Sequence, residues 1–366
     1  MAANIQETIQ SIIDRAVADG KERGLQFAVY HQGRLIVDAC AGIADINTGA
    51  PVTKTTLFPV FSTTKGITAA VMHMLAKRGL FSYDDRISKY WPEFGKHGKE
   101  NITIRQALNH TAGIPQLPVD LSVAETADWD KMITIIESLR PIYEPGTRME
   151  YHALNYGWIL GELARRVDGR PFGQIVEEDI CKPLGITGEL YVGCPADQEY
   201  RVAFLEDPGA EQIETWYEEN AIITIPIALL PLHTWMNRSE GRICCQPAGN
   251  GVMTARAIAR VYASLLPGGV DGVELLPPAR IEAAIQPPVF PNEPPQTMAL
   301  GFGIGTDDPT MGESPLSFGH YGAGGSFGFA DPQCELSMGY THNLFSSGGL
   351  DVAKEIADVV RGSLKA

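Results

Sequence analysis

Strand-like segments lie near both ends of this chain, and helical patterns fill its middle. Apolar runs at 25–30 and 35–40 are joined by His31-Gln32-Gly33-Arg34, which predicts a β-hairpin. Further strands are expected toward the other end, at 299–305, 316–322, 326–330 and 336–341. The simplest arrangement brings the strands of the two ends together in space. The sequence therefore predicts one antiparallel sheet built from both chain ends.

Apolar residues also recur at helical spacing at both termini. Ile5 and Ile9 lie on one face of an expected first helix, and Val352 and Ile356 lie on one face of the last. Helices between them are expected at 66–77, 103–108, 130–139, 154–167, 172–180 and 255–266. We expect an α/β (α+β) fold in which residues 1–84 and 289–366 form a sheet domain flanked by the terminal helices. Residues 85–288 are then an inserted, mostly helical domain.

The charge balance argues against several classes of partner. Lysine and arginine total 29 against 44 aspartates and glutamates, so the formal net charge is −15. A field of this sign repels phosphate backbones and anionic lipids, so neither nucleic acid nor a membrane surface is an expected partner. No apolar run reaches the roughly 20 residues of a membrane span, and the first residues lack the pattern of an export signal. A cytoplasmic protein is therefore expected.

The cysteines and histidines give no sign of a disulfide framework or a metal site. The six cysteines form no C-x-x-C pair, so reduced thiols are expected. None lies in a setting that would make it a low-pKa nucleophile. Histidines and carboxylates lack H-E-x-x-H or other ligand spacing. We therefore expect neither a metal nor another cofactor.

Ser62-Thr63-Thr64-Lys65 is the only Ser-x-x-Lys sequence in the chain. It lies where a strand-like run becomes a helical one, and residues three apart share a helix face, so the Lys65 amine is expected beside the Ser62 hydroxyl. The helix dipole and burial both disfavour an ammonium, which would let Lys65 accept the Ser62 proton near neutral pH. Alternatively, Ser62 only caps the helix and Lys65 lies on the surface.

Two further motifs follow in order. Ala107-Leu108-Asn109-His110-Thr111-Ala112-Gly113-Ile114-Pro115 comes first, and Glu144-Pro145-Gly146 then precedes Tyr151. With this ordered set, residues 25–345 resemble the class C β-lactamase superfamily of serine hydrolases, and especially its carboxylesterase branch, the family VIII esterases and related acyltransferases. The resemblance implies a β-lactamase/penicillin-binding-protein-like fold and an acyl-Ser62 intermediate.

The second motif of that family is Tyr-x-Asn, and here Tyr151-His152-Ala153 keeps the tyrosine but not the asparagine. The resemblance implies that Tyr151 acts as a partner base or as the acid that protonates the leaving group. An adjacent Lys65 cation would favour its phenolate form. Alternatively, Tyr151 is a core aromatic residue whose hydroxyl bonds to the backbone. Asn155 comes two residues too late to replace the missing asparagine, and we expect it to be a capping or solvent-facing residue.

The third family motif is Lys-Thr-Gly, and His320-Tyr321-Gly322 fits its position, followed by Ala323-Gly324-Gly325. The resemblance implies that small residues there, Gly322 and Gly324, let substrate lie along the strand. It also implies that the N–H groups of Ser62 and Ala323 form an oxyanion hole. A histidine is a weaker anchor for a substrate carboxylate than a lysine. Alternatively, His320 is a structural residue at a strand end.

Two other features need an interpretation. Ser326 lies in a G-x-S-x-G sequence, but that nucleophile elbow requires a following helix, and a strand end and turn are expected instead. Ser326 is therefore not the expected nucleophile. Loops near the middle of the chain carry four large apolar side chains: Trp216, Tyr217, Trp235 and Met236. The resemblance implies that they line a substrate pocket. Alternatively, they serve only in packing.

The leading hypothesis is a carboxylesterase that acts on a small-molecule ester or amide. An acyltransferase that passes the acyl group to an amine or alcohol shares the first half-reaction and is the second hypothesis. Ala153, His320 and the missing export signal argue against a β-lactamase or D-Ala-D-Ala peptidase. The intact Ser62, Lys65 and Tyr151 argue against an inactive binding protein.

Overall fold

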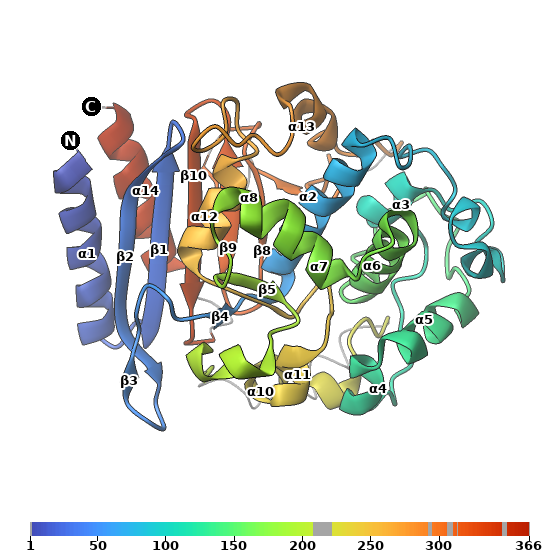
Figure 1. Ribbon diagram of the computed structural model, residues 1–366, viewed down its shortest axis with the longest axis horizontal. Helices are drawn as coiled ribbons and strands as arrows, with labels where there is room; N and C mark the ends of the chain where they lie inside the picture. Colours follow the sequence, from blue (N-terminus) through green and yellow to red (C-terminus); the bar gives the residue numbers. More distant parts are fainter. Residues whose placement is uncertain are drawn as a thin grey trace.

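The computed structural model describes residues 2–207, 222–291, 295–305, 310–312, 314–345 and 350–365. Its centre is a seven-stranded sheet with the order β3-β2-β1-β10-β9-β8-β7, in which every neighbouring pair is antiparallel. Its strands are β1 (Gly24–His31), β2 (Arg34–Asp45), β3 (Ala50–Pro51), β7 (Gly303–Ile304), β8 (Phe318–Tyr321), β9 (Phe327–Asp331) and β10 (Leu336–His342). The first strand pairs with the last (Figure 1), which confirms the predicted sheet built from both chain ends.

Helices cover both faces of this sheet. The terminal helices α1 (Ala2–Ala18) and α14 (Asp351–Lys365) share a core with Leu25 and Phe27 of β1. Side chains alternate between the two faces of a strand, so Ala28 of β1 points to the opposite face of the sheet from Phe27. There it belongs to a second hydrophobic core. On that side a helix approaches closely, since a Cβ at Gly339 of β10 would lie 2.2 Å from the carbonyl oxygen of Ala255.

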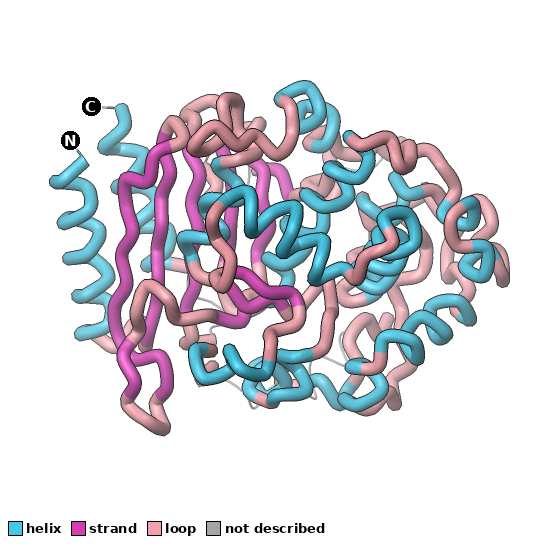
Figure 2. Tube along the Cα trace, viewed as in Figure 1, coloured by secondary structure: helices cyan, strands magenta, loops and turns pink. Residues whose placement is uncertain are grey.

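The remaining elements lie beyond the second face, where helices and loops predominate (Figure 2). The helices are α2 (Thr64–Lys77), α3 (Ile104–Leu108), α4 (Val123–Ala127), α5 (Trp129–Ser138), α6 (Asn155–Asp168), α7 (Phe172–Val176), α8 (Lys182–Leu184), α10 (Leu232–Asn237), α11 (Ser239–Ile243), α12 (Ala255–Ala263) and α13 (Pro278–Ala284). A second sheet has the order β4-β6-β5 and is formed by β4 (Phe58–Pro59), β5 (Leu190–Val192) and β6 (Gly251–Met253). The proposed division at residues 85–288 stays a prediction.

The structure corrects the secondary structure in places. The predicted strand at 299–305 is wrong except for β7, because Gly301 adopts φ +84° and the Ala299 N–H bonds to the Phe302 carbonyl in a tight turn. The predicted helix at 172–180 continues as a π-helical turn at Glu177–Cys181. The small sheet was not predicted, since strands of two or three residues are too short to show a period.

No helix in the described part of the chain is long and apolar enough to cross a membrane. The cytoplasmic location stays a prediction. The cysteines at positions 40, 181, 194, 244 and 245 are free thiols.

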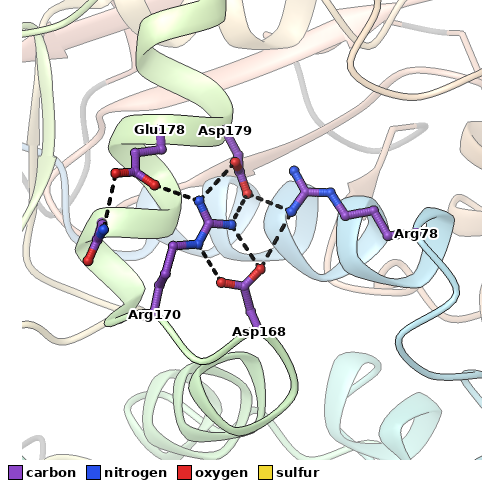
Figure 3. A network of polar contacts seen from close by, with 6 residues as sticks. Arg78, Asp168, Arg170, Glu178 and Asp179 are labelled. Carbon is purple, nitrogen blue, oxygen red and sulfur yellow. Dashed lines mark hydrogen bonds and ion pairs between the residues drawn. The ribbon is translucent and has the colours of Figure 1, made fainter.

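An ion-pair network joins the C-terminal ends of α2 and α6 to the π-helical turn at Glu177–Cys181 (Figure 3). Arg170 contacts Asp168 at 2.5 Å, Asp179 at 2.7 Å and Glu178 at 2.8 Å. Arg78, just after α2, also contacts Asp179 at 2.8 Å. The side chains of Asp168 and Asp179 are only 7% and 12% exposed. These carboxylates therefore depend on the two arginines for compensation of their charge.

We expect Arg170→Met to lower the free energy of unfolding by about 2 to 3 kcal/mol, because it leaves partly buried carboxylates without their main partner. Arg15→Met is the control, since it removes an ion pair with Glu355 in which both side chains are about half exposed, and it should cost at most about 1 kcal/mol. Urea unfolding of both variants measures the difference. Equal losses would show that the Arg170 network adds nothing beyond an exposed pair.

Candidate active site

Ser62 lies in a short 3₁₀ turn, Phe61–Thr63, between β4 and α2. Phe61 has φ +46°, a conformation that side-chain-bearing residues rarely adopt and that neighbouring bonds must hold. The Thr63 hydroxyl donates to the Ser326 carbonyl at 3.0 Å, and the Gly251 N–H donates to the Thr64 hydroxyl at 2.9 Å. The turn is thus tied to both sheets, and Ser62 lines a cavity at the start of α2.

The Lys65 side chain is completely buried, so the alternative that it lies on the surface is wrong. Its Nζ lies 3.0 Å from Ser62 Oγ, 2.7 Å from the Ala153 carbonyl oxygen and 2.9 Å from the Ala248 carbonyl oxygen. Burial lowers the pKa of Lys65 well below its usual range. The predicted direction is therefore correct, and burial is its cause.

These contacts fix the orientation of a neutral Lys65 amine. Carbonyl oxygens only accept hydrogen bonds, so the Ala153 and Ala248 carbonyls take both amine hydrogens. The remaining lone pair then faces Ser62 Oγ. In this state the arrangement can accept a proton from the Ser62 hydroxyl.

Tyr151 reaches the same place from the segment before α6. The Lys65 Nζ lies 4.8 Å from the centroid of its ring, and 36% of the residue is exposed where it lines the cavity. Burial raises the pKa of the Tyr151 phenol, and a hydrogen bond with Ser62 offsets part of that rise. The expectation of a phenolate is therefore wrong. The lysine cation that would favour it is itself disfavoured by burial.

His320 lies on β8 at the cavity wall. Its Nδ1 is 2.7 Å from the Tyr321 carbonyl oxygen, which can only accept, so Nδ1 carries the proton. Burial lowers the pKa of His320 to about 3, with a smaller contribution from Lys65 in the same direction. The ring is consequently neutral at pH 7 and cannot supply the fixed positive charge of a lysine. Its Nε2 is buried and has no hydrogen-bond partner among the described residues.

The turn after β8 brings Gly322 and Ala323 to the cavity wall. A Cβ at Gly322 would lie 2.0 Å from the Val60 carbonyl oxygen, so only glycine lets this turn lie against the segment that leads to Ser62. Gly324 has φ +87°, and a Cβ there would lie 2.7 Å from the Phe345 ring. Gly324 is not among the residues that line the cavity.

The cavity measures about 870 Å³ and has mainly apolar walls. These walls include Leu154, Ile225, Leu232, Trp235 and Met298. Among the described lining residues, Glu150 is the one with a charged side chain, and there is no lysine or arginine. The cavity is therefore suited to an uncharged organic group.

The predicted pocket residues have different outcomes. Trp235 lines the cavity, whereas Met236 is fully buried and does not line it. Trp216 and Tyr217 lie outside the described residues. Sequence reasoning missed the Ala153 and Ala248 carbonyls that hold Lys65, because no motif marks a residue that contributes only its backbone. It also missed Glu150, whose side chain no motif marks.

The comparisons with known proteins agree with this geometry. The β-lactamase family model matches residues 9–361. The chain belongs to the β-lactamase family. This β-lactamase-family protein is 32% identical over 339 residues to the "Esterase/beta-lactamase LipL" of Mycobacterium tuberculosis, a match that covers 87% of this chain and 77% of the relative.

Solved structures give the same result. A family VIII carboxylesterase superposes with a TM-score of 0.87 at 31% identity, covering 98% of this chain and 97% of that chain. A penicillin-binding protein homologue from Caulobacter crescentus superposes with a TM-score of 0.85, also at 31% identity and with the same coverage. The resemblance predicted from the motifs is therefore confirmed.

Ser326 and Asn155 lie outside the family's motifs. Ser326 is buried between β8 and β9, and a strand follows it rather than the helix that a nucleophile elbow requires. Asn155 is neither a solvent-facing residue nor a helix cap, so that expectation is wrong. It is buried, and its amide donates to the carbonyls of Ile114 and Gln116 at 2.7 and 2.8 Å.

We expect Ser62→Ala to abolish covalent labelling by a fluorophosphonate probe, because this β-lactamase-family protein then lacks the hydroxyl that faces Lys65. Ser326→Ala is the control and should label at the wild-type rate, since Ser326 does not line the cavity. Intact mass spectrometry measures both. Labelling that persists in Ser62→Ala but disappears in a folded Ser326→Ala protein would reverse the assignment.

Proposed function

We propose that this chain is a carboxylesterase that acts through an acyl-Ser62 intermediate. The observation that carries the proposal is the buried Lys65 amine, whose two carbonyl contacts leave its lone pair for Ser62. A serine hydroxyl is a weak nucleophile until an adjacent base removes its proton. Lys65 is the group placed to do so.

In the proposed acylation step, Ser62 Oγ attacks the ester carbonyl carbon and its proton passes to Lys65. The backbone N–H groups of Ser62 and Ala323 stabilise the negative charge that develops on the carbonyl oxygen. Tyr151, whose phenol is held in the protonated form, donates its proton to the departing alcohol. The Lys65 ammonium then returns a proton to Tyr151. Water releases the acid in the second half-reaction.

The charges around the cavity favour an uncharged ester. His320 is neutral where the family's third motif has a lysine, and Ala153 stands where the second motif has an asparagine. Glu150 contributes a negative charge to the cavity wall. A substrate carboxylate would find no cation among the described lining residues, which is why we favour an ester over a β-lactam. The carboxylesterase among the similar structures supports the same choice.

Acyl transfer is the second candidate, and the size of the cavity favours it. About 870 Å³ lies near the upper end of the usual range for small-molecule sites, and can hold an acyl group together with an alcohol or amine acceptor. The first half-reaction is the same for both functions. Partitioning of the acyl-enzyme with and without an added alcohol separates them.

The role of Lys65 is tested by Lys65→Arg, which replaces the amine with a guanidinium that stays charged throughout the working pH range and cannot accept the Ser62 proton. We expect kcat/KM for a short-chain nitrophenyl ester to fall by about 10³-fold or more, within the range for loss of a general base. Lys89→Arg, a change at an exposed ion pair, is the control and should leave activity unchanged.

The pH dependence of kcat/KM tests the protonation state that Lys65 needs for its role as the base. The amine must be unprotonated, so wild-type kcat/KM should fall as pH drops through the lowered pKa of Lys65. That acid limb should be absent from the residual activity of Lys65→Arg. A Lys65→Arg variant that kept both its activity and the acid limb would rule out Lys65 as the base.

A further inference from the structure

His110 has a role in the structure that none of the proposed steps uses. It lies just after α3, fully buried, with φ +61°. Residues other than glycine rarely adopt this backbone conformation, although histidine adopts it more often than most. A residue held in such a conformation needs compensating contacts, and those of His110 converge on one segment.

His110 binds the peptide groups on both sides of Tyr151. The N–H of Glu150 donates to the His110 carbonyl oxygen at 3.1 Å. The N–H of His152 donates to His110 Nδ1, also at 3.1 Å. In addition, the His110 and Tyr151 ring centroids are 4.7 Å apart. One residue therefore holds the backbone before and after Tyr151 and also packs against its ring.

The state of the His110 ring suits this task. Because Nδ1 accepts the His152 N–H, the proton of a neutral ring must lie on Nε2. Burial lowers the pKa of His110 well below its usual range, and His152, Lys65 and His320 act in the same direction. The ring thus stays neutral, and Nδ1 stays an acceptor.

The His152 side chain also binds backbone groups on both sides of this contact. Its Nδ1 lies 2.6 Å from the Glu150 carbonyl oxygen, and its Nε2 accepts the N–H of Ile114 at 3.2 Å. The segment around Tyr151 is therefore tied to the turn after α3 at both of its flanking residues.

We propose that His110 is a positioning residue for Tyr151, which it holds with the phenol beside Ser62 and Lys65. This inference rests on the proposed role of Tyr151 as the acid that protonates the leaving alcohol. His110 itself is not among the residues that line the cavity. It affects the reaction only by holding the Tyr151 phenol in place.

Two variants isolate the acceptor at Nδ1. In His110→Asn the amide oxygen takes nearly the place of Nδ1, and asparagine tolerates a positive φ. His110→Gly tolerates the same backbone conformation but has no acceptor. Both variants lose the ring, so their difference reports the hydrogen bond to the His152 N–H.

The substrates are an alkyl ester and a nitrophenyl ester of the same acid. A nitrophenolate leaves without protonation, whereas an alkoxide needs an acid, so loss of Tyr151 function should cost more on the alkyl ester. We expect His110→Gly to lower kcat about 100-fold on the alkyl ester and about 10-fold or less on the nitrophenyl ester, with KM little changed. His110→Asn should stay within about 10-fold of wild type on both.

Tyr151→Phe is the reference in the same assays, and the double variant closes the cycle. If His110 acts through Tyr151, His110→Gly should add little to the loss already caused by Tyr151→Phe. Equal losses in His110→Asn and His110→Gly, or a His110→Gly loss that adds fully to that of Tyr151→Phe, would overturn the inference. Should His110→Gly not fold, His110→Gln replaces it, since its amide reaches the position of Nε2 rather than that of Nδ1.

Different results would contradict the role of Tyr151 and the role of His110. If Tyr151→Phe keeps full activity on the alkyl ester, the proposed role of Tyr151 is wrong and the inference falls with it. If Tyr151→Phe shows the expected dependence on the leaving group and His110→Gly does not, the proposed function stands and only the positioning role is lost.

Discussion

The structure depends on one buried amine. The Lys65 Nζ sits without solvent contact between the carbonyl oxygens of Ala153 and Ala248, with Ser62 Oγ as its third neighbour. Removing a lysine amine from water is costly unless its charge is lost or paired, and no carboxylate among the described residues forms an ion pair with Lys65. Two segments far apart in sequence must therefore pack against the start of α2 before the amine can face the serine.

The same burial explains why the surrounding groups carry so little charge. His110, His152 and His320 all have lowered pKa values, and Tyr151 has a raised one, each with burial as the largest cause. All four are uncharged at neutral pH. Neutral groups can exchange protons and hydrogen bonds with a substrate, but they cannot hold a carboxylate by charge. This electrostatic character links the geometry of the site to the proposed ester chemistry.

Sequence reasoning succeeded where a feature is local or repeats with a period. The spacing of Ser62 and Lys65 placed them on one helix face, and strand-like apolar runs near both chain ends predicted that the two ends share a sheet. It failed where distant segments decide the outcome. The Ala248 carbonyl, the direction of the Tyr151 pKa shift and the contacts of His110 all depend on which segments pack together. The strand expected at 299–305 failed for a local reason, because Gly301 turns the chain.

The central claim is that Lys65 is a neutral amine at the pH at which the enzyme works. Nitrogen-15 NMR of the lysine side chains measures this directly, because the Nζ chemical shift differs between amine and ammonium, and Lys65→Arg assigns the signal. The account predicts the shift of a neutral amine for Lys65 at pH 7.5, while exposed lysines such as Lys89 give ammonium signals. An ammonium signal for Lys65 that persists as the pH rises to 9 would contradict it.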